Sequence, residues 1–169
     1  MKLNKNLILI GMMASGKSTI GGLLAKKLNF RFFDTDFIIE KKTKMKISEM
    51  FKKKGETAFR KLEKKITLSL LNKNNCVIAL GGGAFINETI RKTVEQKGYS
   101  IWLNQNPKTL IDRIKKNNKR PIASNLSNNE LKDLLINRSK IYSKANYKID
   151  CENMQKIEIV NKIIQLLKL

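Results

Sequence analysis

The segment from Gly11 to Ser18 reads GMMASGKS and fits the phosphate-binding pattern G-x-x-x-x-G-K-[ST]. It follows the apolar run Leu7–Ile10 and precedes a segment with helical periodicity, which is the strand, loop and helix context that this pattern requires. Glycine-rich backbone can turn its amide N–H groups toward an anion, and the helix that follows directs the positive end of its dipole to the same point. The pattern therefore predicts a site for the phosphates of a nucleoside triphosphate.

Two side chains of this loop suit phosphoryl transfer. Lys17 is expected to reach the β- and γ-phosphates, and the hydroxyl of Ser18 is expected to be a ligand of Mg²⁺. The alternative is a chance turn of glycine and serine. The apolar strand before the loop and the periodic helix after it favour the phosphate site.

Two carboxylates follow in the segment RFFDTD, residues 31–36, which we expect to be a short strand ending in Asp34 and Asp36. If this strand is parallel to the first one, both carboxylates lie at the carboxyl edge of the sheet beside the phosphate loop. A turn with two solvated aspartates is the alternative interpretation.

Further candidates lie downstream. Arg60 and Glu63 are three residues apart and share a helix face, so the carboxylate can hold the guanidinium in position, although such a pair is more often a surface ion pair of little value. The glycines at 81–83 follow the apolar run 76–80 and offer backbone N–H groups that a ligand can approach without obstruction. A flexible turn is the alternative there.

The helical spacing of apolar residues is absent between residues 116 and 129, a polar segment that contains Arg120 and Pro121. A loop of this length without regular structure is typical of a functional lid or of disorder. A lid that carries an arginine suits phosphoryl transfer, which needs water excluded and transition-state charge neutralised.

The remaining pattern alternates strands with helices. Strands are expected at 7–10, 31–36, 76–80, 100–103 and 147–150, and helices at 17–28, at 37–71 with a break at Gly55, and at 87–97, 107–115, 130–144 and 157–167. This alternation predicts a three-layer α/β fold in which helices flank a five-stranded parallel sheet. The 169 residues suit one domain, 1–169, with a substrate-binding lobe at about 36–65 and a lid at about 116–129.

The net charge of +21 raises the alternative of a P-loop ATPase that binds nucleic acid. The basic residues are mainly lysines scattered over nearly every expected helix, however, and the aromatic residues fall largely on apolar faces, so no stacking surface is apparent. We therefore expect no nucleic-acid partner.

Other features of the sequence bear on the cellular location of the protein. No apolar run approaches the roughly 18 residues that span a bilayer, so no membrane partner is expected. The opening residues resemble a short signal peptide, but cleavage there would remove the phosphate loop, so we expect no export. Cys76 and Cys151 lie far apart and the chain has no histidine, which favours reduced structural thiols in the cytoplasm over a disulfide or a zinc site.

Taken together, these motifs resemble those of the shikimate kinase family over essentially the whole chain. The similarity lies in GMMASGKST, in FFDTD followed by FIIE, in the segment from Ile47 to Glu63, in GGG at 81–83, in RP at 120–121 and in RSKIY at 138–142. The resemblance implies the five-stranded parallel fold of nucleoside monophosphate kinases. It also implies a monomer with ATP and shikimate as substrates.

The resemblance also assigns roles by position. It implies ATP binding by Gly11, Ala14, Ser15, Gly16, Lys17, Ser18, Thr19, Arg113 and Arg120; shikimate binding by Asp36, Arg60, Arg138 and the Gly82 backbone; Mg²⁺ at Ser18 and Asp34; and catalytic roles for Lys17, Asp36 and Arg120. In this assignment Arg113 lies over the adenine and Arg120 is the lid arginine.

The chain departs from the family pattern in a few places. Ala14 stands where the family usually has glycine, which strains the loop if that position needs a positive φ. Ile122 and Ala123 replace the usual lid leucines, the run 76–80 ends without a Walker-B aspartate, and no proline near Lys156 supplies a second face for the adenine.

A kinase of the same fold that acts on gluconate or a nucleotide is the nearest alternative function. Arg60 and Arg138 favour a carboxylate acceptor.

Overall fold

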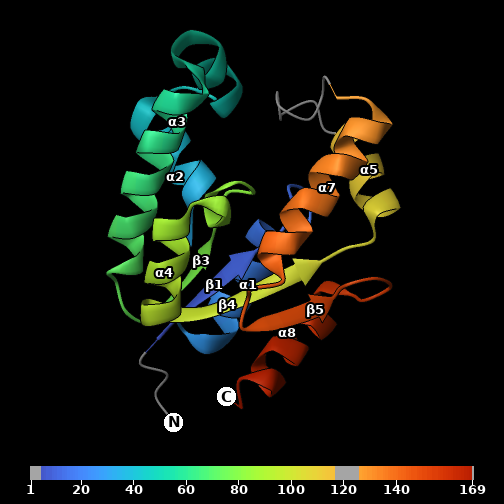
Figure 1. The fold of residues 1–169 in the computed structure, drawn as a ribbon. Coiled ribbons are helices and arrows are strands. Elements are labelled where there is room, and N and C mark those ends of the chain that lie inside the picture. Colours follow the sequence, from blue (N-terminus) through green and yellow to red (C-terminus); the bar gives the residue numbers. More distant parts are fainter. Residues whose placement is uncertain (1–4, 117–125, 169) are drawn as a thin grey trace.

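The computed structural model describes residues 5–116 and 126–168 (Figure 1). Its strands are β1 (Asn6–Ile10), β2 (Arg31–Asp34), β3 (Cys76–Ala79), β4 (Gly98–Asn104) and β5 (Tyr147–Asp150). They form one sheet in the order β2-β3-β1-β4-β5, and every pairing is parallel. The helices are α1 (Lys17–Leu28), α2 (Thr35–Thr43), α3 (Ile47–Leu71), the short 3₁₀ helix η1 (Ala84–Ile86), α4 (Glu88–Lys97), α5 (Pro107–Lys115), α7 (Asn128–Tyr142) and α8 (Lys156–Leu166).

Helices cover both faces of this sheet, as the unbroken apolar composition of its central strands predicts. Along β1, Leu7 and Leu9 pack into one buried cluster, to which α1 and α8 contribute, while Ile8 and Ile10 pack into the opposite cluster, to which α3 and α4 contribute. Figure 1 shows α1 and α8 on one side of the strands and α3 and α4 on the other. The predicted three-layer α/β fold is confirmed.

The strand order determines which chain segments meet at the carboxyl edge. Because β3 lies between β1 and β2, Ala79 is the register partner of both Leu9 and Asp34. The phosphate loop after β1, the aspartates after β2 and the glycines after β3 therefore emerge side by side.

The boundaries differ from the expectation at two functional places. β2 ends at Asp34, and Asp36 lies in the first turn of α2, because the Asp34 carboxylate caps that helix by accepting from the Phe37 amide at 3.2 Å. Helix α7 begins at Asn128, two residues early, because Ser127 and Glu130 form a reciprocal capping box. This S-x-x-E pattern is visible in the sequence, and because of it α7 includes the last two residues of the loop expected at 116–129.

The predicted break in the long helical segment is confirmed at Gly55, whose φ of 76° and ψ of 169° are not helical. The two parts of α3 and helix α2 form the raised lobe at the upper left of Figure 1. Most of the expected lid, including Arg120, lies outside the described residues. No helix in the described part of the chain is long and apolar enough to cross a membrane.

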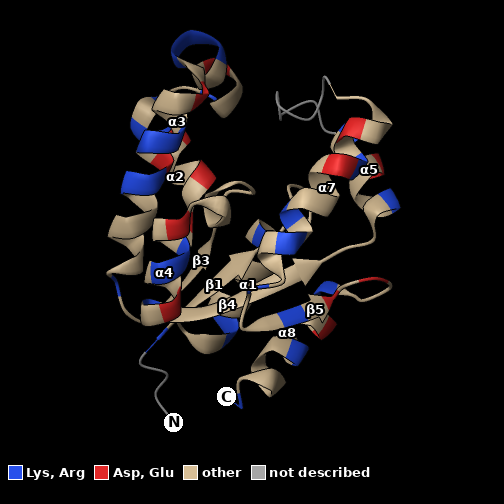
Figure 2. Ribbon diagram, in the orientation of Figure 1, with Lys and Arg blue, Asp and Glu red and all other residues tan. Residues whose placement is uncertain are grey.

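Charge is spread over the molecule. Figure 2 shows lysine and arginine on the α2 and α3 lobe, on α4, on α7 and on α8, interrupted by acidic residues. Several lysines form ion pairs within their own helix, for example Lys53 with Glu49 and Lys92 with Glu88. In this view the basic residues do not gather into one stripe.

The paired glycines of α1 give a test of this packing. A Cβ at Gly21 would lie 2.4 Å from Cε2 of Phe32, whereas a Cβ at Gly22 would have no atom within 4 Å. We predict that Gly21→Ala lowers the free energy of unfolding by about 1–3 kcal/mol through overpacking. Gly22→Ala should raise it by about 0.5–1 kcal/mol through helix propensity. Urea denaturation of both variants measures the difference, and equal effects of the two substitutions would contradict the packing of α1 on β2.

Candidate functional site

The phosphate loop has the backbone conformation that its glycines predict. Gly11 and Gly16 have φ of 139° and 92°, and a Cβ at Gly11 would lie 2.7 Å from the Leu103 carbonyl oxygen. Ala14 has a φ of 63°, in the left-handed region where a Cβ costs on the order of 1–2 kcal/mol. The loop of this chain therefore carries backbone strain at the position where the family usually has glycine.

Lys17 is the first residue of α1, and only 8% of its surface is exposed. Its ammonium donates to the carbonyl oxygens of Gly11 at 2.9 Å and Met12 at 2.7 Å. The side chain thus folds back onto the loop, and its ammonium lies against the loop carbonyls. This is the position from which a lysine meets the β- and γ-phosphates in P-loop proteins.

A cavity of about 550 Å³ opens over the loop. The P-loop contributes Met13, Ala14, Gly16, Lys17, Ser18 and Thr19 to its lining; Asp34, Asp36, Leu80, Arg113, Ile114 and Lys116 complete it. Arg113 comes from α5 and donates to the Ala14 carbonyl oxygen at 3.4 Å. This volume and this lining suit a nucleoside triphosphate.

Ser18 and Asp34 meet at the edge of this nucleotide cavity, where the Ser18 hydroxyl donates to Oδ2 of Asp34. Across the described part of the chain, no three Asp, Glu or Cys side chains converge as a metal site. Mg²⁺ usually takes only one or two protein oxygens and completes its octahedron with phosphate oxygens and water. One hydroxyl and one carboxylate beside a phosphate loop fit that requirement.

A second, smaller cavity of about 40 Å³ lies between the lobe and the glycines that follow β3. Arg60, Glu63 and Arg138 are its charged lining beside Asp36, and Met13, Ile47, Phe51, Phe59, Gly82 and Gly83 complete it. Arg138 is 6% exposed, and its Nε has no hydrogen-bond partner among the described residues. A buried guanidinium with an unused donor calls for an anionic acceptor such as a carboxylate.

Glu63 holds Arg60 as the three-residue spacing predicts. Its carboxylate accepts from Nη1 of Arg60 at 2.7 Å and is 3% exposed, so this is not the surface pair of the alternative interpretation. Burial raises the pKa of Glu63, while the Arg60 guanidinium acts in the opposite direction. Glu56 accepts from Nε of Arg60 at 3.1 Å. The carboxylates of Glu56 and Glu63 therefore hold the Arg60 guanidinium in one orientation.

The glycines after β3 make room for these charged groups. A Cβ at Gly81 would lie 2.5 Å from the Asp36 carboxylate and 2.7 Å from that of Glu63, and a Cβ at Gly83 would lie 2.4 Å from Nη1 of Arg60. The Gly81 amide donates to the Thr35 hydroxyl at 2.8 Å, which ties this turn to the start of α2. Any side chain at Gly81 or Gly83 would push the charged groups of the smaller cavity apart.

Tyr142 is a residue of the site whose contact sequence reasoning missed. Its spacing from Arg138 predicts a shared helix face, but the structure adds that its hydroxyl donates to the Gly82 carbonyl oxygen. Desolvation raises the pKa of Tyr142 to about 12, so the phenol keeps its proton at neutral pH. The ring also packs against Trp102, with centroids 5.9 Å apart.

The structure thus brings most of the predicted site residues together around two adjoining cavities. Gly11 and Ser15 are buried in the loop and do not line the nucleotide cavity. Arg120 lies outside the described residues, so its predicted role remains a prediction.

A phosphate loop beside a compartment with two guanidinium groups defines a P-loop kinase for a small anionic acceptor. The sequence model described as shikimate kinase matches residues 13–168. A shikimate kinase of Persephonella marina is 39% identical over 95% of this chain and 97% of that protein. The chain therefore belongs to the shikimate kinase family and is an ATP-dependent kinase.

Solved structures agree with this assignment. A shikimate kinase from Acinetobacter baumannii in complex with shikimate superposes with a TM-score of 0.92 at 32% identity, covering 97% of this chain and 93% of that one. A shikimate kinase from Aquifex aeolicus gives a TM-score of 0.87 at 37% identity, with 96% of each chain covered. The similarity thus extends from the sequence motifs to the whole fold.

The contact of Tyr142 with Gly82 gives a test of the site. We predict that Tyr142→Phe lowers the free energy of unfolding by about 1–2 kcal/mol at neutral pH, because it leaves the buried Gly82 carbonyl without its donor. The pKa of Tyr142 is about 12 in the folded state and 10 in the unfolded state. The protonated phenol therefore contributes its full stabilisation below pH 10, and this contribution is lost as the pH rises toward 12.

Urea denaturation at neutral and at alkaline pH measures this effect. The stability difference between wild type and Tyr142→Phe should narrow as the pH rises above 10, since the variant cannot titrate at this position. A difference that stays constant with pH would contradict the buried, protonated phenol.

Proposed function

We propose that this enzyme transfers the γ-phosphate of ATP to the 3-hydroxyl of shikimate at the boundary between its two cavities. The observation that carries this proposal is that Met13 and Asp36 line both the nucleotide cavity and the smaller one. An acceptor in the smaller cavity would meet the terminal phosphate beside the Asp36 carboxylate. In-line transfer depends mainly on such positioning and on charge neutralisation.

The charged lining supports shikimate as the acceptor. The carboxylate of shikimate suits the forks of Arg60 and Arg138, and the structurally similar Acinetobacter enzyme is in complex with shikimate. Phe51 and Phe59 form an apolar wall with ring centroids 4.7 Å apart, against which a small ring can pack.

The nucleotide cavity supports the remaining assignments. Lys17 would turn from the loop carbonyls to the β- and γ-phosphates, and Arg113 would stack on the adenine. Ser18 and Asp34 would hold Mg²⁺, which supplies charge neutralisation on the phosphate oxygens when it is bound. Arg120 is assigned to transition-state charge by its sequence position alone.

Asp36 is the residue to which we assign the acceptor hydroxyl. Asp34 is committed to the Ser18 hydroxyl and to the cap of α2, whereas Asp36 lies one half-turn further, beside Glu63 and Gly81. A carboxylate there can orient the hydroxyl and accept its proton. Because the transition state of phosphoryl transfer is loose, orientation is the larger part of its role.

We also propose that the enzyme is a cytoplasmic monomer. The two cavities are built from the described residues of one chain, and Cys76 and Cys151 are buried free thiols, which suits a reducing compartment. Sedimentation equilibrium with and without substrates tests the monomer.

The function itself is tested by ADP release over a panel of small acceptors: shikimate, gluconate, nucleotides and other hydroxy acids, with and without an oligonucleotide. We expect Mg²⁺-dependent turnover with shikimate and no effect of the oligonucleotide. Lys17→Met is the inactive control, because it removes the phosphate contact and should keep the circular dichroism spectrum. Faster turnover with gluconate or a nucleotide would overturn the proposal.

The two aspartates should give different kinetic defects. We predict that Asp36→Asn lowers kcat by roughly two orders of magnitude with ATP affinity preserved, because it loses the oriented charge at the acceptor. The matched change Asp34→Asn should instead raise the Mg²⁺ concentration needed for half-maximal rate. Titrations of both variants with Mg²⁺ and shikimate measure this, and the reverse pattern would show that the two roles are exchanged.

The planar geometry of the two guanidinium groups, and not only their charge, should contribute to shikimate binding. We predict that Arg60→Lys and Arg138→Lys each weaken shikimate binding about tenfold or more with little change in ATP affinity, since an ammonium cannot pair with both carboxylate oxygens. Arg31→Lys is the control, because Arg31 donates to the Asn74 carbonyl at 3.2 Å and does not line either cavity. Calorimetric shikimate affinities equal to wild type in both site variants would remove these arginines from the acceptor site.

A further inference from the structure

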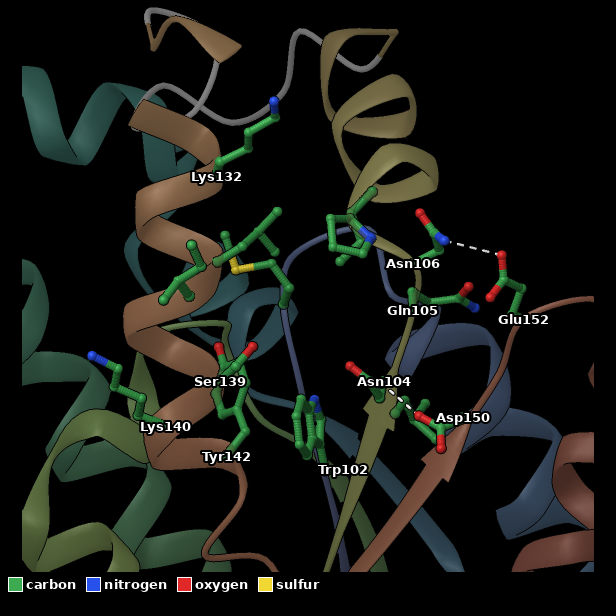
Figure 3. Close-up of a pocket in the computed structure, with 16 residues that line it drawn as sticks. Trp102, Asn104, Gln105, Asn106, Lys132, Ser139, Lys140, Tyr142, Asp150 and Glu152 are labelled. Atoms are coloured by element: carbon green, nitrogen blue, oxygen red, sulfur yellow. Dashed lines mark hydrogen bonds between the residues drawn. The ribbon is translucent and has the colours of Figure 1, made fainter. Parts of the chain in front are cut away.

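Another cavity, of about 700 Å³, lies between α5, α7 and the carboxyl ends of β4 and β5 (Figure 3). It shares no lining residue with the nucleotide and acceptor cavities. Its volume falls within the range of small-molecule sites. The activity proposed above uses none of this space.

The floor of this cavity combines apolar surface with one hydrogen-bond donor. Trp102 is 8% exposed, and Figure 3 shows its indole nitrogen directed into the cavity. This N–H is open to the cavity and is not among the buried donors that lack a partner in the described part of the chain. Because the N–H faces the cavity, an occupant can accept a hydrogen bond from it. Met12, Leu110 and Leu135 provide apolar walls around it.

The carboxylates at the rim are already paired, so they do not require a cationic occupant. Asp150 accepts from the Asn104 amide at 2.6 Å and pairs with Lys148 at 3.0 Å. Glu152 accepts from the Asn106 amide at 3.0 Å. Figure 3 shows both contacts with asparagine on the same side of the cavity.

Cationic side chains border the opposite side. Lys132 and Lys140, both on α7, line this side of the cavity, and Lys132 reaches across the upper rim toward α5 (Figure 3). Lys148 lies over the indole ring, 5.3 Å from its centroid, where it offsets the charge of Asp150. An anion is therefore favoured over a cation at the indole donor.

We propose that this cavity is a second ligand site, which binds a small carboxylate with one apolar ring. The ring would pack on Trp102 and the apolar walls, and a carboxylate oxygen would accept from the indole N–H. Lys132 would add attraction at the rim. The apolar ring distinguishes this ligand from the polar ring of shikimate.

Benzoate is a suitable probe because Trp102 is the one tryptophan of the chain, so indole fluorescence reports on this cavity directly. The titration is made with shikimate and ADP both saturating, so that the arginines and the nucleotide cavity are occupied. We expect a saturable fluorescence change with benzoate, at least tenfold weaker binding of the neutral benzamide, and still weaker binding of benzylamine. No saturable change, or equal binding of the three probes, would overturn the proposal.

Variants then locate the probe by calorimetry. Trp102→Phe keeps an apolar ring but removes the donor, and we expect benzoate to bind about tenfold more weakly, the effect of losing one hydrogen bond to a charged acceptor. Lys132→Gln should weaken binding about threefold, and the control variant Lys61→Gln should leave it unchanged, because Lys61 is exposed on α3 and lines none of these three cavities. Equal affinities in wild type, Trp102→Phe and Lys132→Gln would overturn the proposed site.

A final arm separates this site from the nucleotide site. Benzoate is titrated in the presence and absence of ADP. We expect the same affinity in both, because the two cavities have no residue in common. Competition between benzoate and ADP would assign the cavity to the adenine and overturn a separate site. Failure of this proposal leaves the kinase assignment intact, since that rests on the acceptor panel.

Discussion

The parallel pairing of β3 between β1 and β2 is the constraint on which the site depends. Ala79 is in register with both Leu9 and Asp34, so three chain segments leave the sheet at one edge within a few residues of each other. The P-loop brings cationic and amide groups, the end of β2 and the first turn of α2 each bring a carboxylate, and the glycines after β3 leave the backbone accessible. A one-residue slip of β2 would reverse the faces of its side chains and move Asp34 away from Ser18.

The acceptor compartment depends on balanced burial of charge. Arg138 is buried and Arg60 is partly buried, and Glu63 and Asp36 lie beside them, so neither sign is left without compensation. Burying a charge without a partner is costly, whereas paired charges with satisfied hydrogen bonds are tolerated. Arg60 is fixed by two carboxylates, but Arg138 keeps an unused Nε donor. The compartment is therefore organised in advance for one more anionic group.

Much of this was predictable from the sequence because its signals are local. The P-loop pattern, the break at Gly55 and the pairing of Arg60 with Glu63 depend on residues close in the chain, and the structure has all three. The strain expected at Ala14 if its position needs a positive φ is present, since its φ is 63°. The boundary of α2 was wrong because the cap by Asp34 competes with extension of the strand.

Other features were not predictable because they join distant residues. The hydroxyl of Tyr142 reaches Gly82, 60 residues earlier, and Met12 Sδ accepts from Arg138 at 3.6 Å across 126 residues. Nor does the sequence indicate that the Trp102 N–H faces a cavity, because that depends on how far α5 and α7 stand apart. Periodicity assigns such residues to a face but does not identify what lies opposite.

The central claim is that Asp36, and not Asp34, meets the acceptor at the boundary of the two cavities. A crystal structure with shikimate, Mg²⁺ and a non-hydrolysable ATP analogue tests it most directly. The account predicts the 3-hydroxyl of shikimate within hydrogen-bond distance of the Asp36 carboxylate and in line with the γ-phosphate, with Asp34 on the metal side. A ternary complex in which the 3-hydroxyl contacts Asp34, or in which the shikimate carboxylate lies away from Arg60 and Arg138, would contradict it.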